Sequence, residues 1–506
     1  MTAAKRAGLS SGGETPEETH EMSTPIPPNS ARLTAAAAAA ATGGRVRDGG
    51  DRVACGIVSD SRAVTSGCAF VALRGQRWDG HDYVGAAIDA GAVLVVVEPG
   101  RAPPHGSADV VEVDDTLRAW GDLARAHVRA WREASRAVFA ITGSAGKTTT
   151  KEFCAALAGS VGKTHSTAGN LNNRVGTPAM AFGLGPEHRF AVFEIGMSLP
   201  GEIAALARIL EPDAGVITNI GLAHAAGVGG TRAAVAREKG DLFAALGPAA
   251  VAVACFDDAA AMQQLERARG ARIVTFGVGD GADYRLVDRA AGWEGSSLHF
   301  VRRGAGPPCR VRLPIPGEVA ALDFLGALAA VEAVSGPLAK DAIDGALASG
   351  MKLPPGRMQP RLLRSGTTIL DDAYNANPES VRAALRTLGE LARGRRAVVV
   401  LGEMCELGPS GGDEHASLGH AVAQAGVDVI VSCGGIADRT ALEAEKAGVR
   451  AIRVSGAEAA ARSAVAVVAP GDVVLVKASR SIGAERVVDA LVAAGGGEPA
   501  GPDGVV

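Results

Sequence analysis

The chain has 506 residues, which is too long for a single hydrophobic core, so we expect two to four domains. Its 51 Lys and Arg nearly balance its 55 Asp and Glu, and the net charge of −4 provides no electrostatic footprint for nucleic acid. The seven Cys are scattered without a Cys-x-x-Cys pair or a metal-binding spacing, which indicates reduced thiols and a cytoplasmic protein. Because no apolar run approaches roughly 20 residues, we expect no membrane span.

Both ends of the chain are polar and rich in turn-forming residues. Residues 1–31 contain many Gly, Ser, Thr, Glu and Pro, and they carry too little apolar surface to order themselves. They are predicted to be a disordered extension. Residues 495–506 have a similar composition and are predicted to be a flexible tail.

Residues 32–115 are predicted to form a first, mixed α/β domain. Short buried strands are expected at 68–73 and 92–97, with a helix at 83–90. The run at 92–97 is continuously apolar, which is typical of a strand that is covered on both faces of a sheet.

Residues 116–355 are predicted to form a central domain that begins with a linking helix within 116–135. Buried strands alternate with amphipathic helices, which indicates a parallel α/β sheet. The expected strands are 137–142, 190–195, 214–219 and 249–254. Residues 283–318 contain shorter strand-like pieces and predict an antiparallel edge. Pro354, Pro355 and Gly356 are a candidate hinge.

Residues 356–494 are predicted to form a third, Rossmann-like domain. Its expected strands are 367–370, 396–403, 427–433, 450–454 and 472–477, and its helices include 416–425 and 485–494. No Gly-x-Gly-x-x-Gly run opens the first helix, so a dinucleotide site is not indicated.

The strongest motif is a glycine-rich loop between the strand at 137–142 and a helix at 149–158. It consists of Gly143, Ser144, Ala145, Gly146, Lys147, Thr148 and Thr149. Glycines let backbone amides approach phosphate oxygens, and a helix N-terminus adds favourable partial charge. Lys147 is expected to reach the β- and γ-phosphates of ATP, and the Thr148 hydroxyl to bind Mg²⁺. Ile141 stands where the longer form of the motif has a further Gly, so the loop is the shortened form.

Three other residues are open to two interpretations each. Glu194 ends a predicted parallel strand, so it either faces the ligand crevice and a Mg²⁺ ion or lies in solvent. His224 follows the next strand and is either a metal ligand or a loop residue without a role. Lys239 lies on a predicted helix, where the residue pattern alone favours an ordinary surface lysine.

Polar clusters elsewhere indicate ligand contacts. The loop 371–378, which contains Asp372 and Asn375, is richer in polar groups than the capping of a helix requires. Asn170, Asn172 and Asn173 form a polar patch in the central domain. Lys477 ends a buried strand and Arg480 follows it, and the alternative for both is a surface charge.

Taken together, these segments resemble the Mur ligase family, the ATP-dependent amide ligases of peptidoglycan synthesis. The resemblance extends over residues 32–494, and its specificity comes from the order of many short motifs. These are DSR at 60–62, FVALRG at 70–75, DGHD at 79–82, GSAGKTT at 143–149, TAGNLNN at 167–173, FEIG at 193–196, KGDLF at 239–243, DDAYNANP at 371–378 and LGEMCELG at 401–408.

The resemblance implies a role for most of the candidate residues. It implies that Lys239 is carbamylated and, with His224, holds a second Mg²⁺, while Thr148 and Glu194 serve the metal near the γ-phosphate. Arg357, Asp372 and Asn375 are then expected at the nucleotide, across the domain cleft. Asp60, Ser61 and Arg62 belong to what resembles the uridine-diphosphate-binding module. Ala478 departs from the family, which tends to have Gly there.

The resemblance also implies substrates. The loop 374–377 and the segment 402–404 are similar to those of the member that joins D-alanyl-D-alanine to UDP-N-acetylmuramoyl-tripeptide, and the Asp-Asn-Pro-Arg loop of another member is absent. The resemblance to this member implies that the substrate is contacted by Asn170, Asn172, Asn173, Lys477 and Arg480. We also expect the protein to be a monomer. Two alternatives are a related ligase that adds another amino acid and a nucleotide-dependent switch protein.

Overall fold

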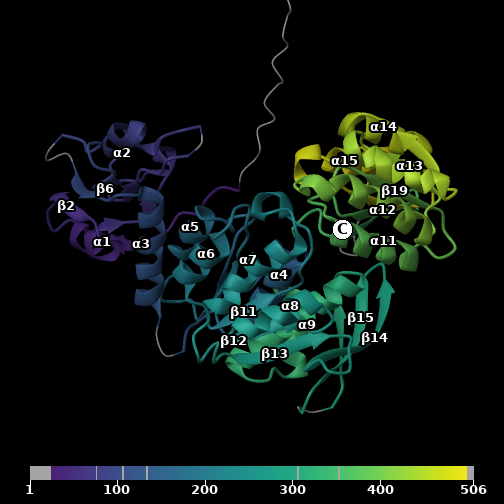
Figure 1. The fold of residues 1–506 in the computed structure, drawn as a ribbon, viewed down its shortest axis with the longest axis horizontal. Helices are drawn as coiled ribbons and strands as arrows, with labels where there is room; N and C mark the ends of the chain where they lie inside the picture. Colours follow the sequence, from purple (N-terminus) through teal and green to yellow (C-terminus); the bar gives the residue numbers. More distant parts are fainter. Residues whose placement is uncertain are drawn as a thin grey trace, which may run out of the picture.

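The computed structural model describes residues 24–75, 77–104, 108–132, 135–304, 307–351 and 354–497. Figure 1 shows three lobes: an N-terminal lobe in purple and blue, a central lobe in teal and a C-terminal lobe from green to yellow. Each lobe contains its own sheet with helices packed on it. The predicted three-domain α/β architecture is confirmed.

The N-terminal lobe has a mixed five-stranded sheet in the order β2-β7-β6-β5-β4, in which only β2 is antiparallel to its neighbour. The strand β6 is fully buried, as its apolar run predicts. The elements of this lobe are β1 (Arg32–Leu33), α1 (Ala35–Thr42), β2 (Arg45–Asp48), β3 (Ala54–Cys55), β4 (Ile57–Val58), β5 (Ala69–Val71), α2 (Val84–Asp89), β6 (Leu94–Val97) and β7 (Asp109–Glu112).

Residues 24–31 pack on the fold, so the prediction of disorder up to residue 31 is wrong for this part. The Asn29 side chain donates to the Ile57 carbonyl at 2.9 Å and accepts from the Ile57 amide at 3.0 Å. Ala31 is buried, and the Thr24 hydroxyl donates to Asn170 at 2.8 Å. Side-chain amides and contacts with other segments hold this stretch, and its own composition does not reveal them. Residues 1–23 lie outside the described residues.

The central lobe has a nine-stranded sheet in the order β16-β15-β14-β13-β12-β11-β8-β10-β9. The strands from β9 to β14 are parallel, whereas β14, β15 and β16 are mutually antiparallel, so the predicted antiparallel edge is confirmed. The strands are β8 (Ala137–Thr142), β9 (Thr164–Ser166), β10 (Phe190–Glu194), β11 (Ala214–Ile217), β12 (Val251–Cys255), β13 (Arg272–Gly277), β14 (Tyr284–Gly292), β15 (Gly295–Arg302) and β16 (Cys309–Leu313).

Helices cover this sheet and connect it to the N-terminal lobe. The Asp115 side chain caps α3 by accepting from the Arg118 amide at 2.9 Å, an interaction that contributes about 1 kcal/mol. The helix α9 is apolar on nearly all sides because it packs on α4 and on the sheet, with Phe324 against Phe153. The helices are α3 (Thr116–Trp131), α4 (Lys147–Gly159), α5 (Gly176–Ala181), α6 (Glu202–Leu210), α7 (Arg232–Ala244), α8 (Ala259–Gln264), α9 (Glu318–Ser335) and α10 (Lys340–Gly345).

The C-terminal lobe has a six-stranded sheet in the order β17-β18-β22-β19-β20-β21, and it is parallel except for β17. Its elements are β17 (Gln359–Leu362), β18 (Thr368–Asp371), α11 (Pro378–Leu391), β19 (Ala397–Leu401), α12 (Gly411–Gln424), β20 (Val429–Ser432), α13 (Asp438–Lys446), β21 (Arg450–Arg453), α14 (Gly456–Val467), β22 (Val473–Lys477) and α15 (Glu485–Ala494). The carbonyls of Gly495 and Gly497 accept from backbone amides of the 364–365 turn, so the prediction of a flexible tail is wrong for residues 495–497. The rest of that predicted tail, 498–506, lies outside the described residues.

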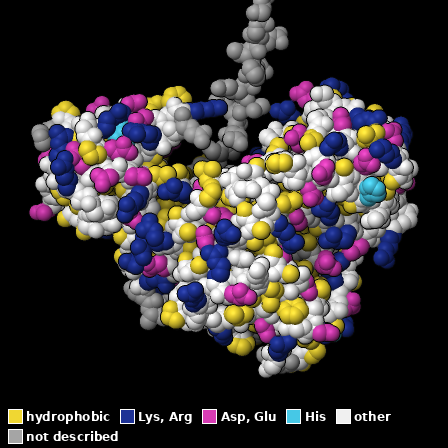
Figure 2. All heavy atoms as spheres, in the orientation of Figure 1, with side chains coloured by type: hydrophobic (Ala, Val, Ile, Leu, Met, Phe, Trp, Pro, Cys, Tyr) yellow, Lys and Arg dark blue, Asp and Glu magenta, His cyan; other side chains and the backbone are white. Residues whose placement is uncertain are grey.

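Three properties of the surface and the thiols bear on function. In Figure 2, basic and acidic side chains are interspersed over all three lobes on the face shown. All seven Cys are unpaired. In the part of the chain that the structure describes, no helix is long and apolar enough to cross a bilayer.

Candidate functional site

The phosphate loop lies between β8 and α4, where two glycines allow close packing. Gly143 has φ 157° and Gly146 has φ 80°, which are values that favour glycine. A Cβ atom on Gly143 would overlap the Thr218 hydroxyl, and one on Gly146 would overlap the Asp323 carboxylate. The backbone therefore turns sharply enough for α4 to begin at Lys147 with its first amides open to a ligand.

Polar groups after β11 hold the loop in place. The Ser144 amide donates to the Asn219 carbonyl at 3.0 Å, and the Ala145 amide donates to the Asn219 side chain at 2.9 Å. The Thr218 hydroxyl donates to the Ala145 carbonyl at 2.6 Å. These hydrogen bonds hold the loop through the protein's own groups, which lowers the cost of ordering it around phosphate.

Lys147 lies inside this loop, and its ammonium donates to the Gly143 carbonyl at 2.9 Å. Burial lowers the pKa of Lys147, while the nearby Glu194 carboxylate opposes that shift. Asp323 is buried against the loop, and burial raises its pKa well above the usual range. The protein compensates the positive charge of Lys147 only in part, and a bound phosphate group would supply the remaining negative charge.

Glu194 ends β10 and is 3 % exposed, so the interpretation as a solvent-facing residue is wrong. Its carboxylate accepts from the Thr148 hydroxyl at 2.8 Å and from the Asn172 side chain at 2.7 Å. A hydroxyl and a carboxylate side by side at the end of a phosphate loop are the oxygen donors that Mg²⁺ prefers, together with phosphates of the nucleotide. These residues therefore fit a Mg²⁺ ion.

Lys239 lies on α7 and is 1 % exposed, so the residue-pattern interpretation as a surface lysine is wrong. Its ammonium makes no hydrogen bond or ion pair with the residues that the structure describes. Burial, followed by the Lys147 charge, lowers the pKa of Lys239 well below its usual range. The shift favours the neutral amine, and the nearby Glu194 carboxylate opposes it.

The C-terminal lobe closes over the phosphate loop through several direct contacts. Arg357 donates to the Thr148 hydroxyl at 3.1 Å and stacks on the Tyr374 ring, with the guanidinium carbon 4.2 Å from the ring centre. The Asn377 side chain donates to the Ser144 carbonyl at 2.9 Å. The Leu222 amide donates to Glu379 at 3.2 Å. Asn377 was not among the residues predicted from the sequence to contact the phosphate loop.

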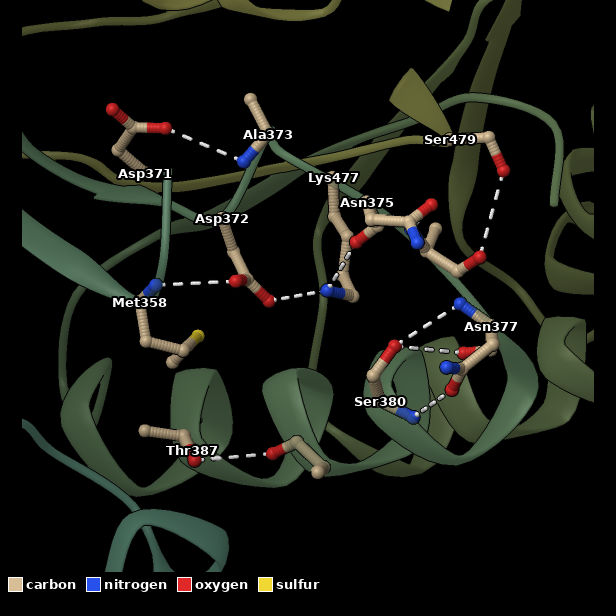
Figure 3. Close-up of polar contacts among 12 residues, drawn as sticks. Met358, Asp371, Asp372, Ala373, Asn375, Asn377, Ser380, Thr387, Lys477 and Ser479 are labelled. Atoms are coloured by element: carbon tan, nitrogen blue, oxygen red, sulfur yellow. Dashed lines mark hydrogen bonds and ion pairs between the residues drawn. The ribbon is translucent and has the colours of Figure 1, made fainter. Parts of the chain in front are cut away.

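Figure 3 shows the loop that follows β18 and the residues that hold it. The Lys477 ammonium donates to Asp372 at 2.5 Å and to the Asn375 carbonyl at 2.9 Å. Asn377 and Ser380 form a reciprocal capping box at the start of α11. Because Lys477 is 3 % exposed, the alternative interpretation of this lysine as a surface charge is wrong.

A cavity of about 790 Å³ lies between the central and C-terminal lobes. It brings together most of the predicted residues: Ser144, Ala145, Gly146, Lys147, Thr148, Thr149, Asn170, Asn172, Asn173, Glu194, His224, Arg357, Asp372, Asn375, Lys477 and Arg480. Lys239 does not line this cavity. Among the described residues, no group of three or more His, Cys, Asp and Glu is arranged to hold a metal ion, so a bound Mg²⁺ would need other oxygens as well.

Some predicted residues lie outside the cavity or have structural partners within it. Asp60, Ser61 and Arg62 are in the N-terminal lobe, where Arg62 donates to Asp60 at 2.7 Å and holds the pKa of that carboxyl below its usual value. Asn173 lines the cavity, but its side chain also accepts from the Gly176 amide at 2.8 Å at the start of α5. Arg480 is half-exposed beside the Tyr374 ring.

Family models match all three lobes. They are described as "Mur ligase family, catalytic domain" over residues 55–128, "Mur ligase middle domain" over 141–331 and "Mur ligase, glutamate ligase domain" over 356–480. Curated relatives named UDP-N-acetylmuramoyl-tripeptide–D-alanyl-D-alanine ligase include those of Synechocystis sp. and Escherichia coli. The first is 34 % identical over 86 % of this chain and 92 % of its own length, and the second is 35 % identical over 76 % and 82 %.

Solved structures agree with these matches. The structure "Crystal structure I of MurF from Acinetobacter baumannii" has a TM-score of 0.83 and 29 % identity, and it covers 92 % of this chain and 100 % of that one. A MurF ligase from Thermotoga maritima, solved in complex with ADP, has a TM-score of 0.75 and 28 % identity over 86 % and 96 %. The fold, the phosphate loop and these matches define an ATP-dependent ligase. The chain belongs to the Mur ligase family.

Proposed function

We propose that this chain joins D-alanyl-D-alanine to the terminal carboxylate of UDP-N-acetylmuramoyl-tripeptide at the expense of ATP, in peptidoglycan synthesis. The observation that carries the proposal is the run of relatives with that activity in their names, which are 32–35 % identical and match 76–91 % of this chain. The cavity between the two lobes supports it, because a phosphate loop faces polar side chains from the third domain there.

The proposed reaction has two steps. An oxygen of the substrate carboxylate forms a bond to the γ-phosphorus of ATP while the bond to ADP breaks, giving an acyl phosphate. The amine of D-alanyl-D-alanine then forms a C–N bond to the acyl carbon, phosphate leaves, and the amine loses a proton. Positioning and charge stabilisation are the main contributions that a protein makes to phosphoryl transfer.

The residues of the chain suit these requirements. Lys147 lines the cavity within the phosphate loop, where it would bind the β- and γ-phosphates and reduce the repulsion between the two anions. Thr148 and Glu194 would hold Mg²⁺, which neutralises phosphate charge when it is bound. Arg357 reaches Thr148 from the third domain and would contact the nucleotide, together with the loop of Asp372 and Asn375. Closure of the lobes keeps water away from the acyl phosphate.

Other site residues would bind the substrates. Asn170, Asn172 and Asn173 come from one loop of the cavity, and Lys477 and Arg480 come from the opposite lobe, which suits a ligand that spans both. Asp60, Ser61 and Arg62 would bind the uridine diphosphate part from the N-terminal lobe. We include in the proposal that the protein acts as a monomer in the cytoplasm.

A carbamate on Lys239 is part of the proposal. The neutral amine attacks carbon dioxide, a C–N bond forms, and one proton passes to solvent. Burial of Lys239 and its lowered pKa favour the neutral amine that this step needs. With His224, the resulting anion would hold a second Mg²⁺ at the edge of the cavity.

The decisive experiment measures phosphate release from ATP by the purified chain with Mg²⁺ and UDP-N-acetylmuramoyl-tripeptide, with and without D-alanyl-D-alanine. We expect release only when both substrates are present, with a pentapeptide product by mass spectrometry. If another amino acid supports release and D-alanyl-D-alanine does not, the proposed substrate is wrong and the chain is a related ligase. Release that needs neither substrate would indicate a nucleotide switch.

A further inference from the structure

His224 and Glu406 meet across the boundary between the central and C-terminal lobes. The Nδ1 atom of His224 is in hydrogen-bonding contact with Oε2 of Glu406. The Ala226 amide donates to the Glu406 carbonyl at 3.2 Å, so the two loops are joined at two points. Both side chains line the cavity. We propose that Glu406 is a positioning residue, which orients the His224 ring toward the metal site when the C-terminal lobe closes.

The backbone that carries His224 is already fixed. His224 adopts a left-handed conformation with φ 59°, which costs a non-glycine residue about 1 kcal/mol or more and therefore needs surrounding contacts. The Gly230 amide donates to the Ala225 carbonyl at 2.7 Å, and a Cβ atom on Gly227 would overlap the Ser198 carbonyl. With its backbone held, the remaining freedom of His224 is rotation of its side chain.

Glu406 is held just as firmly on the opposite side. It also has a left-handed backbone, with φ 63°. The preceding Cys405 amide donates to the Ser479 hydroxyl at 2.8 Å, and the Met404 amide donates to Nε2 of the buried His415 at 3.1 Å. The loop therefore presents the Glu406 carboxylate from a defined position on the C-terminal lobe.

The chemistry of the contact selects one form of the ring. A carboxylate only accepts hydrogen bonds, so the proton of the neutral imidazole lies on Nδ1 and the lone pair lies on Nε2. Metal-binding histidines commonly have a carboxylate on the nitrogen that does not bind the metal. Since Glu406 moves with the C-terminal lobe, domain closure would set both the orientation and the tautomer of His224. This inference rests on the metal-binding role of His224 in the proposed function.

The test measures the affinity of the full-length protein for Mn²⁺ by electron paramagnetic resonance, with a non-hydrolysable ATP analogue bound. We expect Glu406→Ala to weaken Mn²⁺ binding by about 10-fold or more, and Glu406→Gln, which keeps an acceptor oxygen, to stay within about threefold of the natural protein. Glu458→Ala is the matched control, because that side chain is 74 % exposed and pairs with Arg486. Thermal unfolding checks that each variant is folded. If Glu406→Ala does not fold, Glu406→Asp replaces it, because the aspartate side chain is too short to reach His224.

A second experiment distinguishes a positioning role of Glu406 from a role in only holding the two lobes together. If Glu406 acts through His224, then Glu406→Ala causes no further loss of Mn²⁺ affinity in a His224→Ala background. Unchanged affinity in Glu406→Ala, an equal loss in the His224→Ala background, or a Gln variant as weak as the Ala variant would overturn the proposal. The measurement uses neither UDP-N-acetylmuramoyl-tripeptide nor D-alanyl-D-alanine, so an error in the proposed substrates would leave its result unaffected.

Discussion

Lys477 and Asp372 form a buried ion pair, with 2.5 Å between Nζ and Oδ2, at the point where β22 and β18 both end. The lysine also donates to the Asn375 carbonyl at 2.9 Å, and the aspartate accepts from the Met358 amide at 3.1 Å. The pair therefore joins the sheet, the loop that faces the cavity and the segment that enters the C-terminal lobe. Burial lowers the pKa of Lys477, while Asp372 opposes that shift.

We expect Lys477→Met to destabilise the C-terminal lobe by about 3–5 kcal/mol, because Asp372 would keep a buried charge without its partner. Urea-induced unfolding measures the loss. Arg453→Met is the control, since its ion pair with Glu445 is exposed and should contribute less than about 1 kcal/mol. Similar losses in the two variants would contradict the importance of this pair.

Lys147→Ala is expected to reduce turnover at least about a thousandfold, because this ammonium is the cation within the phosphate loop. Phosphate release in the presence of both substrates measures the effect. Lys163→Ala serves as the control, because Lys163 is 63 % exposed and lies 3.7 Å from Glu187, outside the cavity. Substantial activity in Lys147→Ala would show that another group neutralises the phosphates.

Lys239→Ala is expected to be severely impaired and to regain part of its activity with a short carboxylic acid, which would occupy the place of the carbamate. The natural protein should lose activity in buffers depleted of carbon dioxide, and ¹³C-labelled bicarbonate should give a carbamate signal in the spectrum. Lys151→Ala tests whether loss of any buried lysine has the same effect, since Lys151 donates to the Thr167 carbonyl at 2.9 Å. Full activity of Lys239→Ala without additive would remove the basis for the carbamate.

Asp79 gives the N-terminal lobe a predictable response to acid. The Asp79 carboxylate accepts a hydrogen bond from the His81 amide at 3.0 Å and lies 2.6 Å from Nδ1 of the His81 ring. The hydrogen bond from the amide is the largest cause of the lowered pKa of Asp79, which is about 2. A folded-state pKa below the unfolded value of 3.8 stabilises the fold above pH 3.8, and this contribution is lost as the pH falls to about 2.

Asp79→Asn should therefore flatten the loss of stability between about pH 4 and pH 2, as measured by thermal unfolding at each pH. Asp82→Asn is the matched control, because Asp82 lies three residues further along, on the short helix Gly80–Tyr83 that Asp79 caps, and is 69 % exposed. Identical acid profiles for Asp79→Asn and the natural protein would contradict the assignment of this response to Asp79.

Elements with a continuous apolar core face could be predicted from sequence to within a residue or two. The strand at 137–142 and the helix at 485–494 have the bounds expected of them, because burial on both faces or on one helical stripe leaves a direct pattern in the residue types. The phosphate loop could be predicted equally well, since its chemistry requires particular residues at fixed spacing between a strand and a helix.

Contacts between domains could not be predicted in this way. Asn377 and Ser144 are separated by 233 residues, and His224 and Glu406 by 182, so no local pattern connects them. Lys239 did leave a signal that was missed. Val235, Lys239 and Leu242 follow the spacing of one helical face and are all buried, so this spacing was compatible with a buried lysine.

The contact between Asn377 and the phosphate loop has a consequence for inhibitors. Because the walls of the cavity belong to two lobes, we expect a molecule that binds both to hold them together and to leave after they separate. Its residence time would then depend on the rate of that opening as well as on its own contacts. Compounds that bridge Ser144 and Asn377 should therefore dissociate more slowly than their equilibrium affinity for either lobe alone suggests.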